Sequence, residues 1–97
     1  MATTINFILR TNRANARGEC PIYIRVTHNR KSKYLSLGIA VKAKDWNEEK
    51  QRVRRSNDSY KKLNHEIERI FTKAQNIKLE LRAEDNVSAK YIINALK

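Results

Sequence analysis

The sequence has little of the material from which metal and catalytic sites are built. Its 97 residues include one cysteine, one proline, two glycines and two histidines. The single Cys20 excludes an internal disulfide, offers no second thiol to a metal, and fits a reducing compartment. Two isolated glycines exclude a glycine-rich phosphate loop. His28 and His65 fall in different expected elements without clustered acidic partners, so we expect no metal ion and no other cofactor.

Long apolar runs are missing as well. No stretch approaches the ~20 apolar residues that a membrane-spanning helix needs. The N-terminus has no charged segment followed by an apolar core of signal-peptide length. We therefore expect a cytoplasmic protein with no membrane partner. A chain of this length buries only a thin core, and no nucleophile, base and orienting group can be assembled from it, so we expect neither an enzyme nor a small-molecule substrate.

Positive charge is what the chain has in excess. Lysine and arginine number 21 against 10 acidic residues, which gives a formal net charge of +11. An excess this large in a short chain favours a polyanionic partner, above all nucleic acid, over a generally basic soluble surface.

The segment 21–41, PIYIRVTHNRKSKYLSLGIAV, alternates apolar and polar residues as β-strands do. The pattern predicts two strands joined by a basic turn at residues 28–33. Because the turn has no glycine, we expect a longer loop instead of a tight two-residue connection. Gly38 inside the third strand predicts a bulge or a bend. Residues 3–10 (TTINFILR) add a first strand, which the loop 11–19 joins to the second.

From residue 59 the apolar period becomes that of a helix. The spacing predicts a helix over about residues 58–83, capped by one of residues 57–59 and packed on the sheet. Its apolar stripe consists of Leu63, Ile67, Ile70, Ala74, Ile77 and Leu81, with Phe71 broadening it. Ser88 can cap a final helix over residues 89–96. That helix runs to the last residue without a C-cap, so we expect the chain to be a fragment of a longer protein.

The predicted fold class is α+β, with a three-stranded antiparallel β-sheet packed against a long C-terminal α-helix and a short trailing helix. The lone Trp46 is expected to plug the end of the core, and stacking on a base is the alternative. One face of the sheet is apolar. The other carries residue types that bind base edges and phosphates, and a small sheet fits the major groove of DNA.

The candidate DNA-binding residues follow from this polar face and from the basic turn. Arginine suits guanine edges, asparagine suits adenine, and hydroxyl groups suit phosphates. The candidates on the face are Asn6, Arg10, Tyr23, Arg25, Thr27, Tyr34 and Ser36. Those at the hairpin tip, expected to meet phosphates, are Arg30, Lys31 and Lys33. The alternative for the face is an ordinary solvated surface with cross-strand Tyr–Arg contacts.

Several stretches together are similar to one known family. The strand TINFILR, the run GECPIYIRVTHNRKSKYLSLGIAVKAKDWNEEKQRV, LNHEIERI and the closing VSAKYI resemble the N-terminal arm-type DNA-binding domain of tyrosine recombinases. These are the integrases of phages and of conjugative or mobilisable elements. The strongest marks are PIYIRVT, the strand end LSLGIAV, and DWN followed by QRV. The pair Asn29-Arg30 departs from the Asn-Gly often found at that turn.

The resemblance implies that double-stranded DNA is the partner and that the sheet enters the major groove of arm-type sites during DNA integration and recombination. It implies an arm-type domain at residues 1–83 and the start of a linker or core-binding domain at 84–97. The catalytic domain lies downstream, so none of Tyr23, Tyr34, Tyr60 and Tyr91 is its nucleophile. Other recombinase subunits are implied as partners in the full-length protein.

Two further function classes stay open. A protein-interaction module would pair its amphipathic helices with another subunit. A small RNA-binding domain is the other, although the major groove of A-form RNA is too narrow for a sheet. Single-stranded nucleic acid calls for more aligned aromatic rings than the two on this face.

Overall fold

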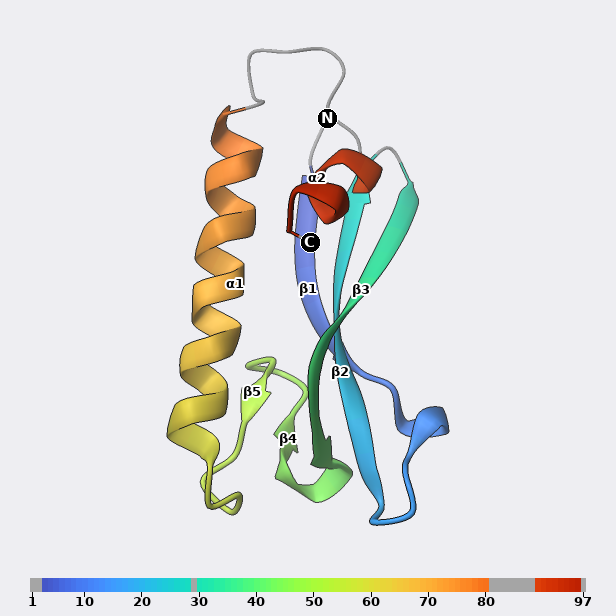
Figure 1. Cartoon of the computed structure of the whole chain (residues 1–97), viewed down its shortest axis with the longest axis vertical. Helices are drawn as coiled ribbons and strands as arrows, with labels where there is room; N and C mark the ends of the chain where they lie inside the picture. The colour runs from blue at the N-terminus through green and yellow to red at the C-terminus, as the bar shows by residue number, and fades with distance from the viewer. Residues whose placement is uncertain (1–2, 29, 81–88, 97) are drawn as a thin grey trace.

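The computed structural model describes residues 3–28, 30–80 and 89–96. It confirms the α+β class, with a three-stranded antiparallel sheet, one long helix and a short trailing helix (Figure 1). The elements are β1 (Thr3–Leu9), a 3-10 turn (Thr11–Arg13), β2 (Glu19–His28), β3 (Lys31–Lys42), a second 3-10 turn (Ala43–Asp45), β4 (Trp46–Asn47), β5 (Arg52–Val53), α1 (Tyr60–Glu80) and α2 (Ala89–Leu96).

The main sheet is a meander in the order β1-β2-β3, with both pairs antiparallel. The short strands β4 and β5 form a separate two-stranded ribbon in which Trp46 pairs with Val53. Strands of two residues are too short to show a period in the sequence, so alternation alone does not predict this ribbon.

The β2–β3 hairpin is tighter than the sequence predicts. His28 pairs with Lys31, so only two residues connect the strands, and the expectation of a longer loop is wrong. Arg30 has a φ of 66°, in the left-handed region that glycine favours. Such a conformation costs a non-glycine residue on the order of 1–3 kcal/mol. The pairing of β2 with β3, which continues up to His28 and Lys31, offsets this cost.

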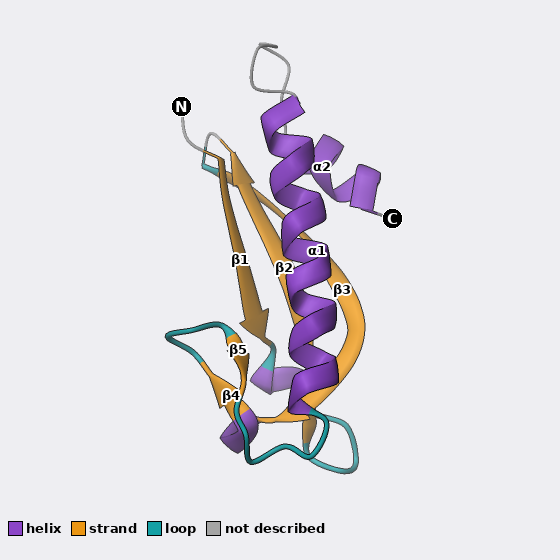
Figure 2. Ribbon diagram, turned by 90° about the vertical axis from the view of Figure 1, so that its left-hand side faces the viewer, coloured by secondary structure: helices purple, strands orange, loops and turns teal. Residues whose placement is uncertain are grey.

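The bulge predicted at Gly38 is confirmed. Pro21 pairs with Ala40 and Tyr23 pairs with Ser36, so β3 uses two more residues than β2 over the same stretch. Gly38 has a φ of 76°, which glycine adopts without a steric penalty. The two extra residues keep the alternation in phase, and β3 curves along its length (Figure 2).

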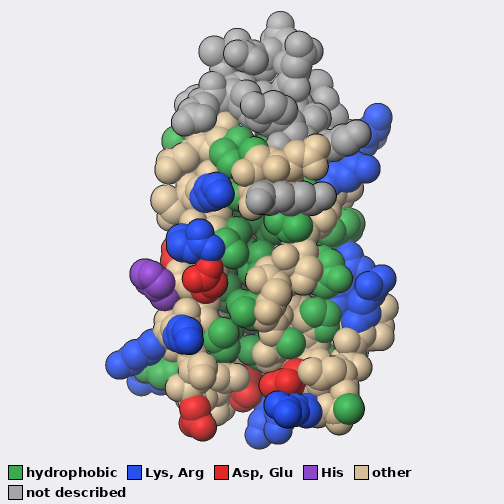
Figure 3. Space-filling view, in the orientation of Figure 1, with side chains coloured by type: hydrophobic (Ala, Val, Ile, Leu, Met, Phe, Trp, Pro, Cys, Tyr) green, Lys and Arg blue, Asp and Glu red, His purple; other side chains and the backbone are tan. Residues whose placement is uncertain are grey.

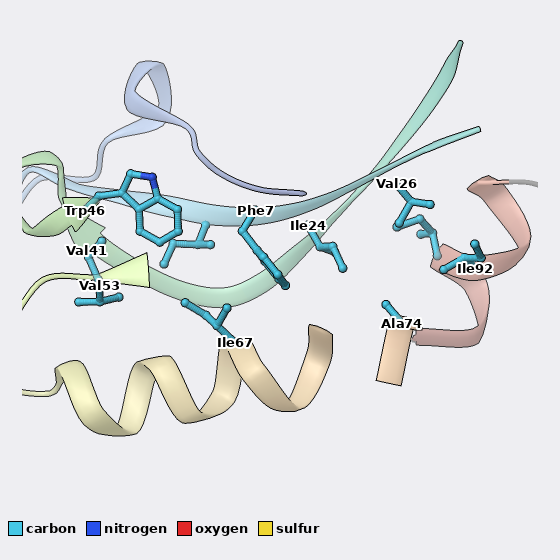
Figure 4. Packing of buried hydrophobic residues seen from close by; sticks show 11 residues of the cluster. Phe7, Ile24, Val26, Val41, Trp46, Val53, Ile67, Ala74 and Ile92 are labelled. Carbon is cyan, nitrogen blue, oxygen red and sulfur yellow. The ribbon is translucent and has the colours of Figure 1, made fainter. Parts of the chain in front are cut away.

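The core lies between one face of the sheet and the two helices. Phe7 and Ile24 are buried on the sheet and face α1, where Ile67 is fully buried (Figure 4). Ile22 is fully buried in the same core. Burying side chains of this size contributes about 1.5–3 kcal/mol each. The predicted helical stripe is confirmed from Leu63 to Ile77, whereas Leu81 lies outside the described residues. Trp46, only 5% exposed, belongs to this core, as predicted.

Helix α2 packs on the same side of the sheet as α1. Ile92 and Ile93 are buried, and α2 contacts α1, β2 and β3. The predicted final helix at residues 89–96 is confirmed, while its expected cap, Ser88, lies outside the described residues. The domain boundary after residue 83 stays a prediction. No helix within the described ranges is long and apolar enough to span a membrane.

Candidate nucleic-acid interface

The sheet face opposite α1 carries three cross-strand rows of side chains. Both helices lie on the other side of the sheet in the described structure (Figures 1 and 2). The strand register builds the rows from one residue of each strand, as cross-strand neighbours about 5 Å apart. The rows are Thr4–Thr27–Ser32, Asn6–Arg25–Tyr34 and Ile8–Tyr23–Ser36. None of these nine side chains is acidic. We call this surface the outer face.

Arg10 lies across the outer face between two tyrosine rings. Its guanidinium carbon is 4.7 Å from the ring centroid of Tyr23 and 4.6 Å from that of Tyr34. The backbone N–H of Arg10 donates to Pro21 O at 2.9 Å, which fixes the base of the side chain beside β2. Tyr34 is 44% exposed, whereas Tyr23 and Arg10 are half-buried. The three residues therefore form one stacked cluster that bridges all three strands.

Arg25 occupies the centre of the middle row, between Asn6 on β1 and Tyr34 on β3. Its side chain is half-buried, and its Nε is buried without a hydrogen-bond partner among the described residues. The Nε of Arg10 is in the same condition. The described polar atoms of the domain therefore leave these two Nε–H donors without a partner.

Asn6 is joined to a residue that the sequence did not single out. The side chain of Gln51, between β4 and β5, donates from Nε2 to Asn6 Oδ1 at 3.1 Å. The same Gln51 accepts the backbone N–H of Phe7 through Oε1 at 2.8 Å. Gln51 has a φ of 55°. A glutamine in a polar turn gives no sequence signal for such a contact, because the contact depends on the fold that returns it to β1.

Two of the three hydroxyl groups in the row Thr4–Thr27–Ser32 are paired with each other. Thr27 Oγ1 and Ser32 Oγ lie 2.7 Å apart, and either one can be the donor. At the other end of the face, Ser36 Oγ accepts the backbone N–H of Gly38 at 3.3 Å. The candidates Thr27 and Ser36 can therefore bind DNA only with the hydrogen-bonding capacity that these contacts leave free.

The two lysines of the hairpin tip do not lie on the outer face. Arg30, Lys31 and Lys33 are all exposed. Lys31 pairs with His28 and Lys33 pairs with Val26, two residues whose alternation places them on the core side of β2. The register thus assigns both lysines to the side of α1 and α2 and does not bring them to the outer face. Their contact with phosphates stays a prediction.

Net positive charge is concentrated in the segment that contains the three strands and the loops between them, because this segment has few acidic residues. Residues 3–42 contain eight lysine and arginine residues and one acidic residue, Glu19. Lysine and arginine side chains lie along both margins of the molecule and at its lower end in Figure 3. By contrast, the two ion pairs among the described residues, Arg52–Glu68 and Arg69–Glu66, both involve α1. The hydrogen bond from Arg69 lowers the pKa of the Glu66 carboxyl.

Other chemistry finds no support in the described ranges. They contain no group of three His, Cys, Asp or Glu side chains placed to hold a metal ion. Cys20 is a free, buried thiol in the interior of the sheet, as a structural cysteine is. Trp46 is buried, so its indole offers no ring face on which a base could stack.

A small basic domain with an acid-free sheet face fits the class of DNA-binding modules. Residues 7–93 match the family model of the arm DNA-binding domain. The chain belongs to this family, whose domains are found in phage integrases. Such a domain is by itself non-catalytic. No curated protein and no solved structure matches the chain.

Proposed function

We propose that this chain is the arm-site-binding module of a tyrosine recombinase and that its outer face enters the major groove of double-stranded DNA. The observation that carries the proposal is the middle row Asn6–Arg25–Tyr34 at the centre of an acid-free face. A sheet of three strands is narrow enough for a groove about 12 Å wide. Its side chains project roughly perpendicular to the strands, toward the base edges.

The lack of carboxylate partners at Arg10 and Arg25 supports a DNA ligand over an ordinary solvated face. Neither residue forms an ion pair with a carboxylate in the described structure. Arginine held away from acidic partners keeps its donors for an incoming acceptor. A guanine edge or a phosphate supplies such acceptors with bidentate geometry.

The basic tip and loop give the domain its sequence-independent affinity. Arg30, Lys31 and Lys33 surround the end of the β2–β3 hairpin, and Arg13 and Arg17 lie in the exposed loop before β2. Cations of this kind hold phosphates and set the register of the sheet on the duplex. In the full-length recombinase the module then tethers the enzyme to arm sites and helps to arrange its subunits.

A protein-interaction function fits this fold less well. The apolar stripe of α1 and the residues Ile92 and Ile93 of α2 are already used in the domain's own core. Among the described residues, Leu79 is the exposed large aliphatic side chain. One leucine is a small basis for a subunit interface of standard size.

The test begins with selection of a preferred duplex from a random library by the intact chain. The affinity for the selected duplex and for its scrambled version is then titrated against salt. A groove-reading sheet predicts a steep salt dependence for both, with the selected duplex bound at least 10³-fold more tightly, the lower end of specific recognition. Equal affinity for the two duplexes at every salt concentration would contradict base readout by the outer face.

A further inference from the structure

In the stacked cluster of Arg10, Tyr23 and Tyr34, the two tyrosines have a different role from the one that the sequence suggests. Read from residue types, each tyrosine is a contact in its own right, with its hydroxyl on a phosphate. In the structure both rings instead lie against the guanidinium of Arg10, at 4.7 and 4.6 Å from ring centroid to guanidinium carbon. We propose that Tyr23 and Tyr34 are positioning residues that hold Arg10 ready for DNA, and that Arg10 makes the contact. The inference rests on the proposed function.

The geometry restricts the motion of Arg10. Arginine is a long side chain that ordinarily loses considerable rotamer freedom when it binds. Here its backbone is tied to Pro21 and both tyrosine rings contact its planar head. A guanidinium that lies over the face of an aromatic ring is attracted to that ring. Much of the ordering of Arg10 therefore takes place during folding and is not required at the moment of binding.

The same geometry selects which atoms are offered to a ligand. The two rings occupy positions against the planar head, and Nε is buried without a partner. The terminal nitrogens are the donors left to reach outward, and they present two N–H groups in a fixed fork. The ligand that fits is a pair of hydrogen-bond acceptors spaced as in O6 and N7 of guanine or as in two phosphate oxygens.

The position of the cluster agrees with this role. Arg10 starts at the end of β1, and its head reaches Tyr34 on β3, so the guanidinium lies over the central strand. Tyr34 is a direct cross-strand neighbour of Arg25. The fork of Arg10 therefore lies next to the middle row, in the part of the outer face that is expected to go deepest into the groove.

A double-mutant cycle on the intact chain separates positioning from direct contact. The variants are Arg10→Ala, Tyr34→Leu, Tyr34→Phe and the double variant Arg10→Ala/Tyr34→Leu, each checked for wild-type thermal unfolding. Arg10→Ala and Tyr34→Leu are each expected to weaken binding to the selected duplex by about 10-fold or more, the size of one lost bidentate contact. Tyr34→Phe keeps the ring and is expected to stay within about twofold of wild type, because a neutral phenyl face still attracts the cation.

The double variant gives the decisive comparison. If Tyr34 acts through Arg10, removing both side chains weakens binding no more than removing Arg10 alone, since coupled residues are not additive. Losses that add up, or a Tyr34→Phe variant as weak as Tyr34→Leu, would overturn the proposal and make the Tyr34 hydroxyl a direct contact. Tyr23→Phe and Tyr23→Leu repeat the comparison for the second ring.

Two further binding measurements show whether the acceptor that Arg10 contacts is a guanine edge or a phosphate. Guanines of the selected duplex are replaced one at a time by 7-deazaguanine. If Arg10 reads a guanine edge, one of these replacements weakens wild-type binding but not that of Arg10→Ala. If it holds a phosphate, Arg10→Ala weakens binding to selected and scrambled duplexes alike and lowers the salt slope by about one. A wild-type chain that fails to prefer any duplex refutes the proposed function itself, whereas a sequence-specific wild type with unchanged Arg10→Ala affinity refutes only the role of Arg10.

Discussion

Gln51 and Asn6 are joined by a hydrogen bond that spans 45 positions of the chain, from Gln51 Nε2 to Asn6 Oδ1 at 3.1 Å. The other side-chain atom of Gln51, Oε1, accepts the backbone N–H of Phe7 at 2.8 Å. That N–H points to the free edge of β1, where an unpaired strand would otherwise be a template for aggregation. Gln51 thus satisfies one backbone donor at this edge and fixes the amide of Asn6 with the same side chain.

Removing this side chain is expected to destabilise the fold. Gln51→Ala leaves the Phe7 N–H without its partner and is expected to lower the free energy of unfolding by about 1–2 kcal/mol. Gln51→Gly loses the same hydrogen bonds but relieves the left-handed conformation at φ 55°, so we expect it to be more stable than Gln51→Ala. Urea unfolding of the two variants makes the comparison, and a less stable glycine variant would contradict the backbone explanation.

Arg25 is expected to affect stability and binding in opposite directions. Its Nε is buried and unpaired, which is a cost that the free domain carries. Arg25→Met keeps the long apolar stem and removes that atom, so the free energy of unfolding is expected to stay level or to rise. Affinity for the selected duplex is expected to fall by about 1–3 kcal/mol, the value of one base contact. Thermal unfolding and DNA titration of the same preparation test both statements.

The hairpin lysines are expected to contribute without regard to base sequence. Lys31→Ala should weaken binding to selected and scrambled duplexes equally and reduce the salt slope by about one, since one phosphate contact is lost. Lys73→Ala is the matched control, because Lys73 is an exposed lysine on α1 and does not belong to the hairpin tip. If both variants change the slope alike, net charge explains the effect and the hairpin tip has no special position on the duplex.

Much of this architecture is predictable because long periodic segments determine it. The alternation Ile22, Ile24, Val26 and the stripe through Ile67 and Ala74 both describe faces that are buried in the structure. The hairpin tip was mispredicted because the absence of glycine argues against a tight turn, whereas strand pairing tolerates Arg30 at a φ of 66°. The mechanism is local propensity overruled by tertiary pairing.

The candidate site was predictable as a set of residues but not as an arrangement. Alternation places Asn6, Arg25 and Tyr34 on one face, and the register confirms that they form one row. Alternation in the sequence cannot reveal that Arg10 stacks on two rings, because that contact depends on how a long side chain crosses β2. Nor does the sequence indicate Gln51, which reaches β1 only through the β4–β5 ribbon.

The single tryptophan provides a test of where DNA does not bind. Trp46 is 5% exposed, and its Nε1 is buried without a partner in the described structure. Its fluorescence is therefore expected at the short wavelengths of a buried indole, and saturating duplex should leave the emission unchanged. Unfolding in urea should shift it to the red. A strong quench on adding DNA to the folded chain would contradict this and return Trp46 to the role of a base-stacking residue.

Helix α2 offers a final prediction, on the extent of the domain. Ile92 is fully buried, as is Ile67 of α1, and α2 contacts both β2 and β3. If α2 is part of the same cooperative unit, Ile92→Ala lowers the free energy of unfolding by about 2–5 kcal/mol, as Ile67→Ala does, and a single transition is retained. The control is Asn94→Ala, at an exposed position of the same helix. Should Ile92→Ala unfold like wild type, the sheet and α1 form the stable unit alone, as expected for a domain that ends near residue 83.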